Sequence, residues 1–203
     1  MNTKIQKRLL LVVTLVVLSG LSPTLPTQAS DQYFALTTGA WSPHATTLNY
    51  YDRYGVYSAD TNYDTGWSLA GAYGIQVNKS LKVEWELGYK QADAKGSNDS
   101  SWIVDSMLNV WWQAPTQHVA PYFGGGVGFA RTHVASYDMY DATGSGIAFQ
   151  AGGGLDIPIN HHGLSLDLGY RYFVITSTSS DYNGSPDLNQ AGSQFSLGIR
   201  SKF

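Results

Sequence analysis

Five charged residues sit at alternating positions within stretches that are otherwise patterned for strands. They are Glu84, Glu86, Asp167, Arg171 and Arg200. Carboxylates and guanidinium groups that face one another away from water must pair, because an unpaired buried charge costs several kcal/mol. Such a network could gate ions or relay protons, or it could simply fill a lumen. We expect a structural plug, with a gated pore or proton-linked switch as the functional alternative.

Other motifs carry weaker chemical signals. The run GGGVGF, residues 124–129, lacks the Lys-Ser/Thr ending and the following helix of a phosphate loop, so it is interpreted as a strand. His161 and His162 are neighbours in a short turn, and adjacent residues of a turn rarely bind the same metal ion. His133 with Asp138 and Asp141 shows no calcium-loop spacing. The sequence therefore predicts no metal site and no cofactor.

A lipid-modifying enzyme would need a His–Ser pair on a lipid-facing strand, oriented by a carboxylate. All five histidines fall in expected loops, turns or strand ends: His44, His118, His133, His161 and His162. The sequence predicts no catalytic residues, and a lipid-modifying enzyme is kept as the second alternative function.

The last ten residues, QFSLGIRSKF, define the element that positions these charges. One face carries Phe195, Leu197, Ile199 and Phe203, and the other face is polar or glycine. This period of two predicts a strand with one apolar face. A barrel in a bilayer must close by pairing its last strand with its first, since lipid satisfies no edge hydrogen bonds.

Seven further stretches alternate in the same way. The register of the first is left open. With the last, the predicted strands cover 33–41, 66–77, 81–91, 102–113, 119–133, 146–157, 164–175 and 194–203. Counting from the short-turn ends places Glu86 at the height of Arg171, and Asp167 at the height of Arg200.

The connections alternate between short turns and longer polar loops. The short ones cover 78–80, 114–118 and 158–163, and the long ones cover 42–65, 92–101, 135–145 and 177–189. Aromatic residues gather near both ends of the strands. These features predict an all-β, eight-stranded antiparallel up-and-down transmembrane β-barrel with turns in the periplasm and loops outside.

The N-terminus has the form of a secretory signal peptide. Three basic residues precede an apolar run from Leu9 to Leu21, and Thr27 and Ala29 suit cleavage after Ala29. We expect a signal peptide over 1–29 and one barrel domain over 30–203. Loss of three basic residues leaves nine against fifteen acidic ones, a formal charge of −6. That charge argues against nucleic-acid binding, and the absence of Cys excludes disulfides.

The first long loop, 42–65, is rich in tyrosine: Tyr50, Tyr51, Tyr54, Tyr57 and Tyr63. Tyrosine offers a large contact area at low entropic cost, as in antibody loops. A binding surface and a partnerless extension of the flanking strands are equally compatible with this composition.

Several strands resemble the opacity-type surface antigens, small outer-membrane barrels similar to the membrane domain of outer-membrane protein A. The resemblance rests on VEWELGYKQ, PYFGGGVGFA, GGGLDIPI, SLDLGYRYF and FSLGIRSKF, in that order, and spans 32–203. It implies an eight-stranded barrel, variable surface loops, adhesive roles in some members, and no shared catalytic residues. It also implies that Phe195, Leu197, Ile199 and Phe203 form a C-terminal signal for the barrel-assembly machinery. Ser201 departs from the apolar alternation.

The predicted protein is a monomer of the bacterial outer membrane that contacts its lipid. Its expected role is surface interaction, adhesion or envelope structure, with an unidentified extracellular ligand. A narrow channel for small solutes is the first alternative.

Overall fold

The structure is a computed structural model. It describes residues 31–44, 46–52, 55–61, 63–96, 100–116, 118–135, 142–159, 163–180 and 190–203. The predicted signal peptide and Tyr54 lie outside these ranges, as do His161, His162, Asp138 and Asp141. Within the part of the chain that the structure describes, no helix is long and apolar enough to cross a membrane.

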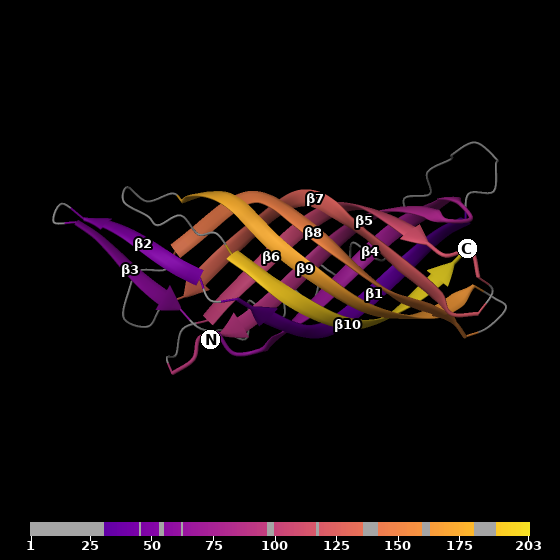
Figure 1. The fold of residues 1–203 in the computed structure, drawn as a ribbon, viewed down its shortest axis with the longest axis horizontal. Coiled ribbons are helices and arrows are strands. Elements are labelled where there is room, and N and C mark those ends of the chain that lie inside the picture. Colours follow the sequence, from indigo (N-terminus) through magenta and orange to yellow (C-terminus); the bar gives the residue numbers. More distant parts are fainter. Residues whose placement is uncertain are drawn as a thin grey trace, which may run out of the picture.

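Eight antiparallel strands close into a barrel, which confirms the predicted fold class (Figure 1). Around the wall the order is β1-β10-β9-β8-β7-β6-β5-β4. Neighbouring strands of the barrel follow one another in the chain, except for the closing pair of β1 and β10 and for β1 and β4, between which β2 and β3 are inserted. The strands are β1 (Asp31–Pro43), β4 (Gly66–Asn78), β5 (Leu81–Asp93), β6 (Ser100–Gln113), β7 (Ala120–Ala135), β8 (Ala142–Pro158), β9 (Leu164–Ser180) and β10 (Gln190–Lys202).

The barrel closes where β1 meets β10, as the terminal alternation predicts. The antiparallel register runs from Tyr33 opposite Lys202 to Pro43 opposite Gly192. The backbone N–H of Phe203 donates to the carbonyl of Gln32 at 3.0 Å, so pairing extends to the last residue. No edge strand is left in the wall, which is what a bilayer requires.

We call the end with the short turns and the C-terminus the turn end, and the opposite end the loop end. Three connections lie at the turn end, at residues 79–80, 114–119 and 159–163. Several strands rise further toward the loop end than expected: β8 begins at Ala142 and β9 ends at Ser180. These strands continue because each extra residue finds a backbone partner, as Gly144 does opposite Ser180.

The expectation that 42–65 is only a polar loop is wrong. It contains a hairpin of β2 (Thr46–Asp52) and β3 (Gly55–Thr61), which form a two-stranded sheet of their own. Tyr50 lies opposite Tyr57, and Tyr51 lies opposite Val56. Residues of high β-propensity can pair locally once the chain reverses, so this region is not a simple extension of the barrel strands.

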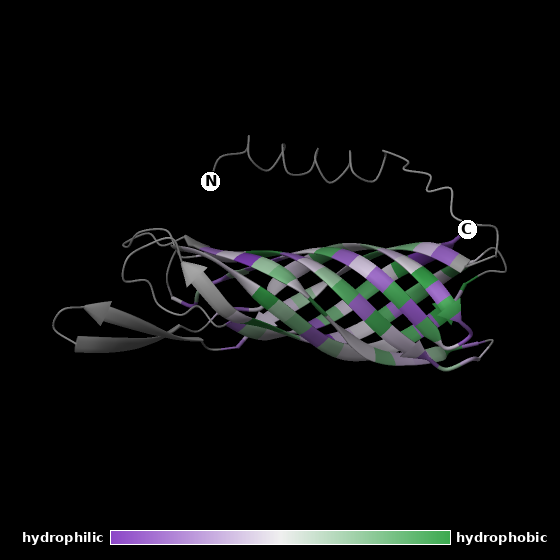
Figure 2. Cartoon of the chain, turned by 90° about the horizontal axis from the view of Figure 1, so that it is seen from above, coloured by the Kyte–Doolittle hydropathy of each residue, from purple (hydrophilic) through white to green (hydrophobic). Residues whose placement is uncertain are grey.

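Alternation along each strand separates the two faces of the wall. The outer face is apolar, with Phe195, Leu197 and Ile199 all at least half exposed, as predicted. The inner face carries the buried polar and charged side chains. Figure 2 shows the resulting checker pattern, in which green apolar residues alternate with purple polar ones along the strands. The barrel is therefore polar inside and apolar outside, as membrane barrels are.

The structure settles the register of β1 that the sequence left open. Tyr33 and Trp41 point into the lumen and are 0% and 1% exposed, whereas Phe34 and Leu36 face outward. Tyr33 and Trp41, near the two ends of this strand, therefore belong to the lumen and contribute to its filling.

Candidate functional site

The lumen holds nine buried charged side chains among the described residues, and each takes part in an ion pair. Four come from β5, two from β9, and one each from β6, β8 and β10. They are Lys82, Glu84, Glu86, Lys90, Asp105, Asp156, Asp167, Arg171 and Arg200. Four cations thus face five anions inside the wall.

Arg200 is the centre of the cluster near the turn end. Its Nη1 lies 2.5 Å from Oδ2 of Asp156, and its Nη2 lies 2.7 Å from Oδ2 of Asp167. The same Nη2 is 3.6 Å from Oε1 of Glu84. Lys82 adds a second cation, 3.3 Å from Asp156. One guanidinium therefore joins carboxylates from three strands, β5, β8 and β9.

Aromatic donors complete the coordination of these carboxylates. Tyr33 Oη donates to Glu84 Oε1 at 2.6 Å, and Trp111 Nε1 donates to Glu84 Oε2 at 2.7 Å. Tyr122 Oη donates to Asp167 Oδ1 at 2.8 Å. The Arg200 guanidinium also lies over the Tyr33 ring, 5.0 Å from its centroid. Rigid rings thus hold the charges in place and fill the space between them.

Midway along the lumen, Arg171 pairs with Glu86 across the barrel. Gln150 Nε2 donates to Glu86 Oε1 at 3.2 Å and to Asn109 Oδ1 at 2.6 Å. The Arg171 guanidinium lies over the Trp111 ring at 5.2 Å. This second network is linked to the first through Trp111, which contacts both.

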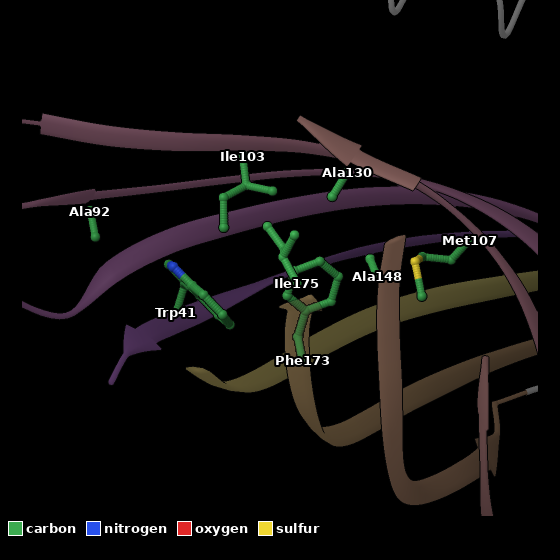
Figure 3. Close-up of a cluster of buried hydrophobic side chains, with 8 residues drawn as sticks. All are labelled: Trp41, Ala92, Ile103, Met107, Ala130, Ala148, Phe173 and Ile175. Atoms are coloured by element: carbon green, nitrogen blue, oxygen red, sulfur yellow. The ribbon is translucent and has the colours of Figure 1, made fainter. Parts of the chain in front are cut away.

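Toward the loop end, the lumen becomes apolar. Lys90 Nζ lies 2.5 Å from Asp105 Oδ2 and 4.1 Å from the centroid of the Phe173 ring. Beside this pair, apolar side chains from opposite walls meet inside the barrel (Figure 3). The apolar cluster comprises Trp41, Ala92, Ile103, Met107, Ala130, Ala148, Phe173 and Ile175.

Glycine makes room for the long side chains of the lumen. A Cβ built on Gly126 would lie 1.9 Å from Oδ1 of Asn109, and one on Gly74 would lie 2.2 Å from the Tyr33 ring. Any larger residue at either position would displace a group that hydrogen-bonds a buried charge or its partner. The glycine-rich stretch 124–128 is thus part of a strand wall, β7.

The five charges singled out from the sequence all lie in the lumen. Glu86 meets Arg171, and Asp167 meets Arg200, at the heights that strand counting indicates. Four more members were not selected: Lys82, Lys90, Asp105 and Asp156. Each lies on the polar face of a strand that alternates with a period of two. The same pattern could therefore have identified them from the sequence.

The arrangement of these side chains favours a structural role, in which they fill the lumen, over a catalytic one. Every charged group is paired, and aromatic rings close the gaps between the pairs. In the described ranges, no three His, Asp or Glu side chains gather in a way that could hold a metal ion. A lumen of this kind can resist deformation, and the charged side chains that the structure describes in it are buried.

Among the described residues, His44 and Ser193 form a contact outside the lumen. His44 Nε2 lies 3.3 Å from Ser193 Oγ, and Tyr170 Oη lies 3.1 Å from the same oxygen. The His44 ring also packs against Tyr172, with centroids 5.4 Å apart. His44 follows β1 directly, as a strand-end residue, and Ser193 lies on the outer face of β10. This arrangement joins the two sides of the closing seam at the loop end.

The sequence model of the outer membrane protein beta-barrel domain family matches residues 13–203. The chain belongs to this family. The closed barrel of the structure agrees with this membership, which implies the bacterial outer membrane as the location. The resemblance to small outer-membrane barrels seen in the sequence is thereby confirmed.

Solved structures share the fold of this outer-membrane barrel at low sequence identity. Neisserial surface protein A aligns with a TM-score of 0.56 and 19% identity, over 84% of this chain and 97% of that one. OprG from Pseudomonas aeruginosa aligns with a TM-score of 0.55 and 14% sequence identity, over 86% of this chain and 96% of OprG. The structure of AlkL in lipid bilayers aligns with a TM-score of 0.51 and 15% sequence identity, over 91% of this chain and 96% of AlkL. A search of curated protein sequences finds no match.

The C-terminal residues of the barrel lie at the turn end of its seam. Phe203 is 67% exposed and stacks on Phe34 of β1, with ring centroids 5.3 Å apart. Lys202 Nζ donates to Gln76 Oε1 at 2.8 Å. The terminal aromatic therefore lies on the outer surface beside the closing strand.

Proposed function

We propose that this protein is a closed-lumen barrel that displays the β2–β3 hairpin outside the cell as an interaction element. The observation that carries the proposal is that the hairpin forms its own sheet beyond the wall. In Figure 1 it extends past the end of the barrel opposite the C-terminus. The loop end faces the outside in this proposal, and the chain arrives there after cleavage of residues 1–29.

Both legs of the hairpin are tied to the barrel rim. On the β1 side, the N–H of His44 donates to the carbonyl of Ala191 at 2.8 Å. On the β4 side, the N–H of Asp64 donates to the carbonyl of Asp93 at 2.8 Å, and Tyr63 bridges to Ala94. Ser42 Oγ and Thr65 Oγ1 join the two legs at 3.1 Å. A hairpin held at both legs projects a defined surface at a low ordering cost.

The composition of the hairpin suits recognition of another macromolecule. Tyrosines at positions 50, 51 and 57 lie in its strands, and Asn, Ser and Thr surround them. Tyr combines apolar area with a polar tip, and it is enriched where protein surfaces bind partners. An isolated two-stranded hairpin is only marginally stable in water, so a partner that covers it would also stabilise it.

The lumen supports this role over the channel alternative. Paired charges fill the turn half and the middle, and the apolar cluster together with the Lys90–Asp105 pair fills the loop half. An eight-stranded barrel has an interior that side chains can just fill. The lumen thus serves as a rigid support for the exposed hairpin. We propose no enzymatic activity and a monomeric barrel, folded by the assembly machinery that serves this class.

The test compares whole cells that display the wild-type barrel with cells that display a variant in which 46–61 is replaced by a short Gly-Ser linker. Binding to immobilised extracellular-matrix proteins and to host cells should be lost in the variant. The double variant Tyr50→Ser with Tyr57→Ser should lose most of it. Lys79→Ser, an exposed position in a turn at the opposite end of the barrel, is the control and should leave binding unchanged. Equal binding by all strains, at equal amounts of folded protein, would refute the proposal.

A further inference from the structure

In the described part of the outer wall, one charged residue lies within the apolar pattern and away from a strand end. Among the outward-facing positions of the described barrel strands, two carry a formal charge at neutral pH, Arg131 and Asp93, and both are exposed; Asp93 is the last residue of β5. The residues before and after Arg131, Ala130 and Thr132, are buried in the lumen. The Arg131 side chain therefore lies on the outer face.

The depth of Arg131 follows from the register of β6, β7 and β8. Arg131 lies between Val104 and Ser145. Two residues toward the turn end, Phe129 is 74% exposed, within the apolar belt. Two residues toward the loop end, His133 stacks on Trp102 with centroids 5.1 Å apart and contacts Thr143 Oγ1 at 3.0 Å. Aromatic residues of this kind mark the membrane–water interface, so Arg131 lies just inside it.

A cation at this position needs an anion. A lipid-facing Arg is costly at the midplane of a barrel and much less costly near the interface. No carboxylate of the described residues lies within ion-pair distance of the Arg131 guanidinium. At this depth, the surrounding headgroups are the available source of negative charge.

We propose that Arg131 and Ser145 form a binding site for the phosphate of an outer-leaflet lipid headgroup. The guanidinium matches phosphate oxygens with two parallel N–H donors. The Ser145 hydroxyl, on the neighbouring strand and also exposed, adds a third donor. The Trp102–His133 stack lies at the rim side of the site, at headgroup depth. The site holds one phosphorylated lipid against β6–β8.

The experiment measures lipid retention by native mass spectrometry of the full-length folded barrel in detergent. The probes are lipid A with both phosphates, fully dephosphorylated lipid A, and inorganic phosphate. Wild type should retain the phosphorylated lipid, and Arg131→Gln should weaken retention about tenfold. Ser145→Ala should weaken it by a smaller factor. Lys79→Gln, an exposed cation at the turn end, is the control and should match wild type.

Three outcomes would overturn the site. Equal retention of phosphorylated and dephosphorylated lipid A by the wild type would show that acyl chains alone bind. Displacement by equimolar inorganic phosphate would indicate a small-anion site without lipid specificity. Retention of phosphorylated lipid A by Arg131→Gln equal to that of the wild type would show that the guanidinium does not hold the lipid. Because the lipid assay uses purified protein, its result is independent of hairpin binding on cells.

Discussion

Arg171 on β9 and Glu86 on β5 form an ion pair across the middle of the lumen. The two strands lie on opposite walls of the barrel, and 85 positions separate the residues in the chain. The pair therefore bridges the lumen where no backbone hydrogen bond can. It stiffens the barrel against flattening and occupies the path that an ion would take.

The energetic coupling of this pair is testable by a double-mutant cycle. Arg171→Ala should lower the free energy of unfolding by roughly 3–5 kcal/mol, because Glu86 stays buried without its cation. The double variant Glu86→Gln with Arg171→Met should recover part of that loss. Urea unfolding in liposomes measures both. Strictly additive effects of the single variants Glu86→Gln and Arg171→Met would show that the residues do not interact.

Arg200 should be more sensitive than Arg171. Its removal leaves Asp156, Asp167 and Glu84 close together with Lys82 as the remaining nearby cation. Arg200→Met should therefore destabilise the barrel more than Arg171→Met in the same urea assay. Adding Asp167→Asn to Arg200→Met should restore some stability by removing one of the unpaired carboxylates. A loss no larger than that of Arg171→Met would indicate that water or rearrangement compensates for the missing guanidinium.

The conductance of the purified barrel distinguishes a filled lumen from an open channel. The wild-type barrel in a planar bilayer should show no stable current steps, because paired charges and the apolar cluster fill the lumen. Trp41→Ala combined with Phe173→Ala removes two rings that lie 6.0 Å apart in that cluster. This variant should leak small ions only if Glu86→Gln and Arg171→Met are also present. Regular steps in the wild type would favour the narrow-channel alternative.

The terminal aromatic should affect assembly more than stability. Phe203→Ser removes the stacking contact with Phe34 and the last element of the proposed assembly signal. Folded protein in the outer membrane should fall severalfold, while synthesis and the unfolding midpoint of the purified barrel change little. The amount of heat-modifiable barrel on SDS gels reports the folded fraction. Ser201→Ala, on the same outer face, is the control.

The period of two in the sequence was enough to predict eight membrane strands, closure of the last on the first, and the outward faces of Phe195, Leu197 and Ile199. It also predicted which heights Glu86 and Arg171 share, since strand residues advance by a constant rise from a common end. Alternation is a local property, and it survives into the folded chain because lipid and lumen lie on opposite sides of every strand.

Only the tertiary structure decided the rest. The inward register of Tyr33 and Trp41 depends on how β1 pairs with β10, since apolar residues occur on both faces of that strand. The meeting of Asp156 and Glu84 on one guanidinium depends on the stagger of strands around the barrel. The hairpin in 42–65 depends on the chain reversing and pairing with itself. Each is a relation between distant or reversed segments. A period of two decides which face a residue takes and rules out one-residue slips, but it does not by itself choose among registers that differ by two residues.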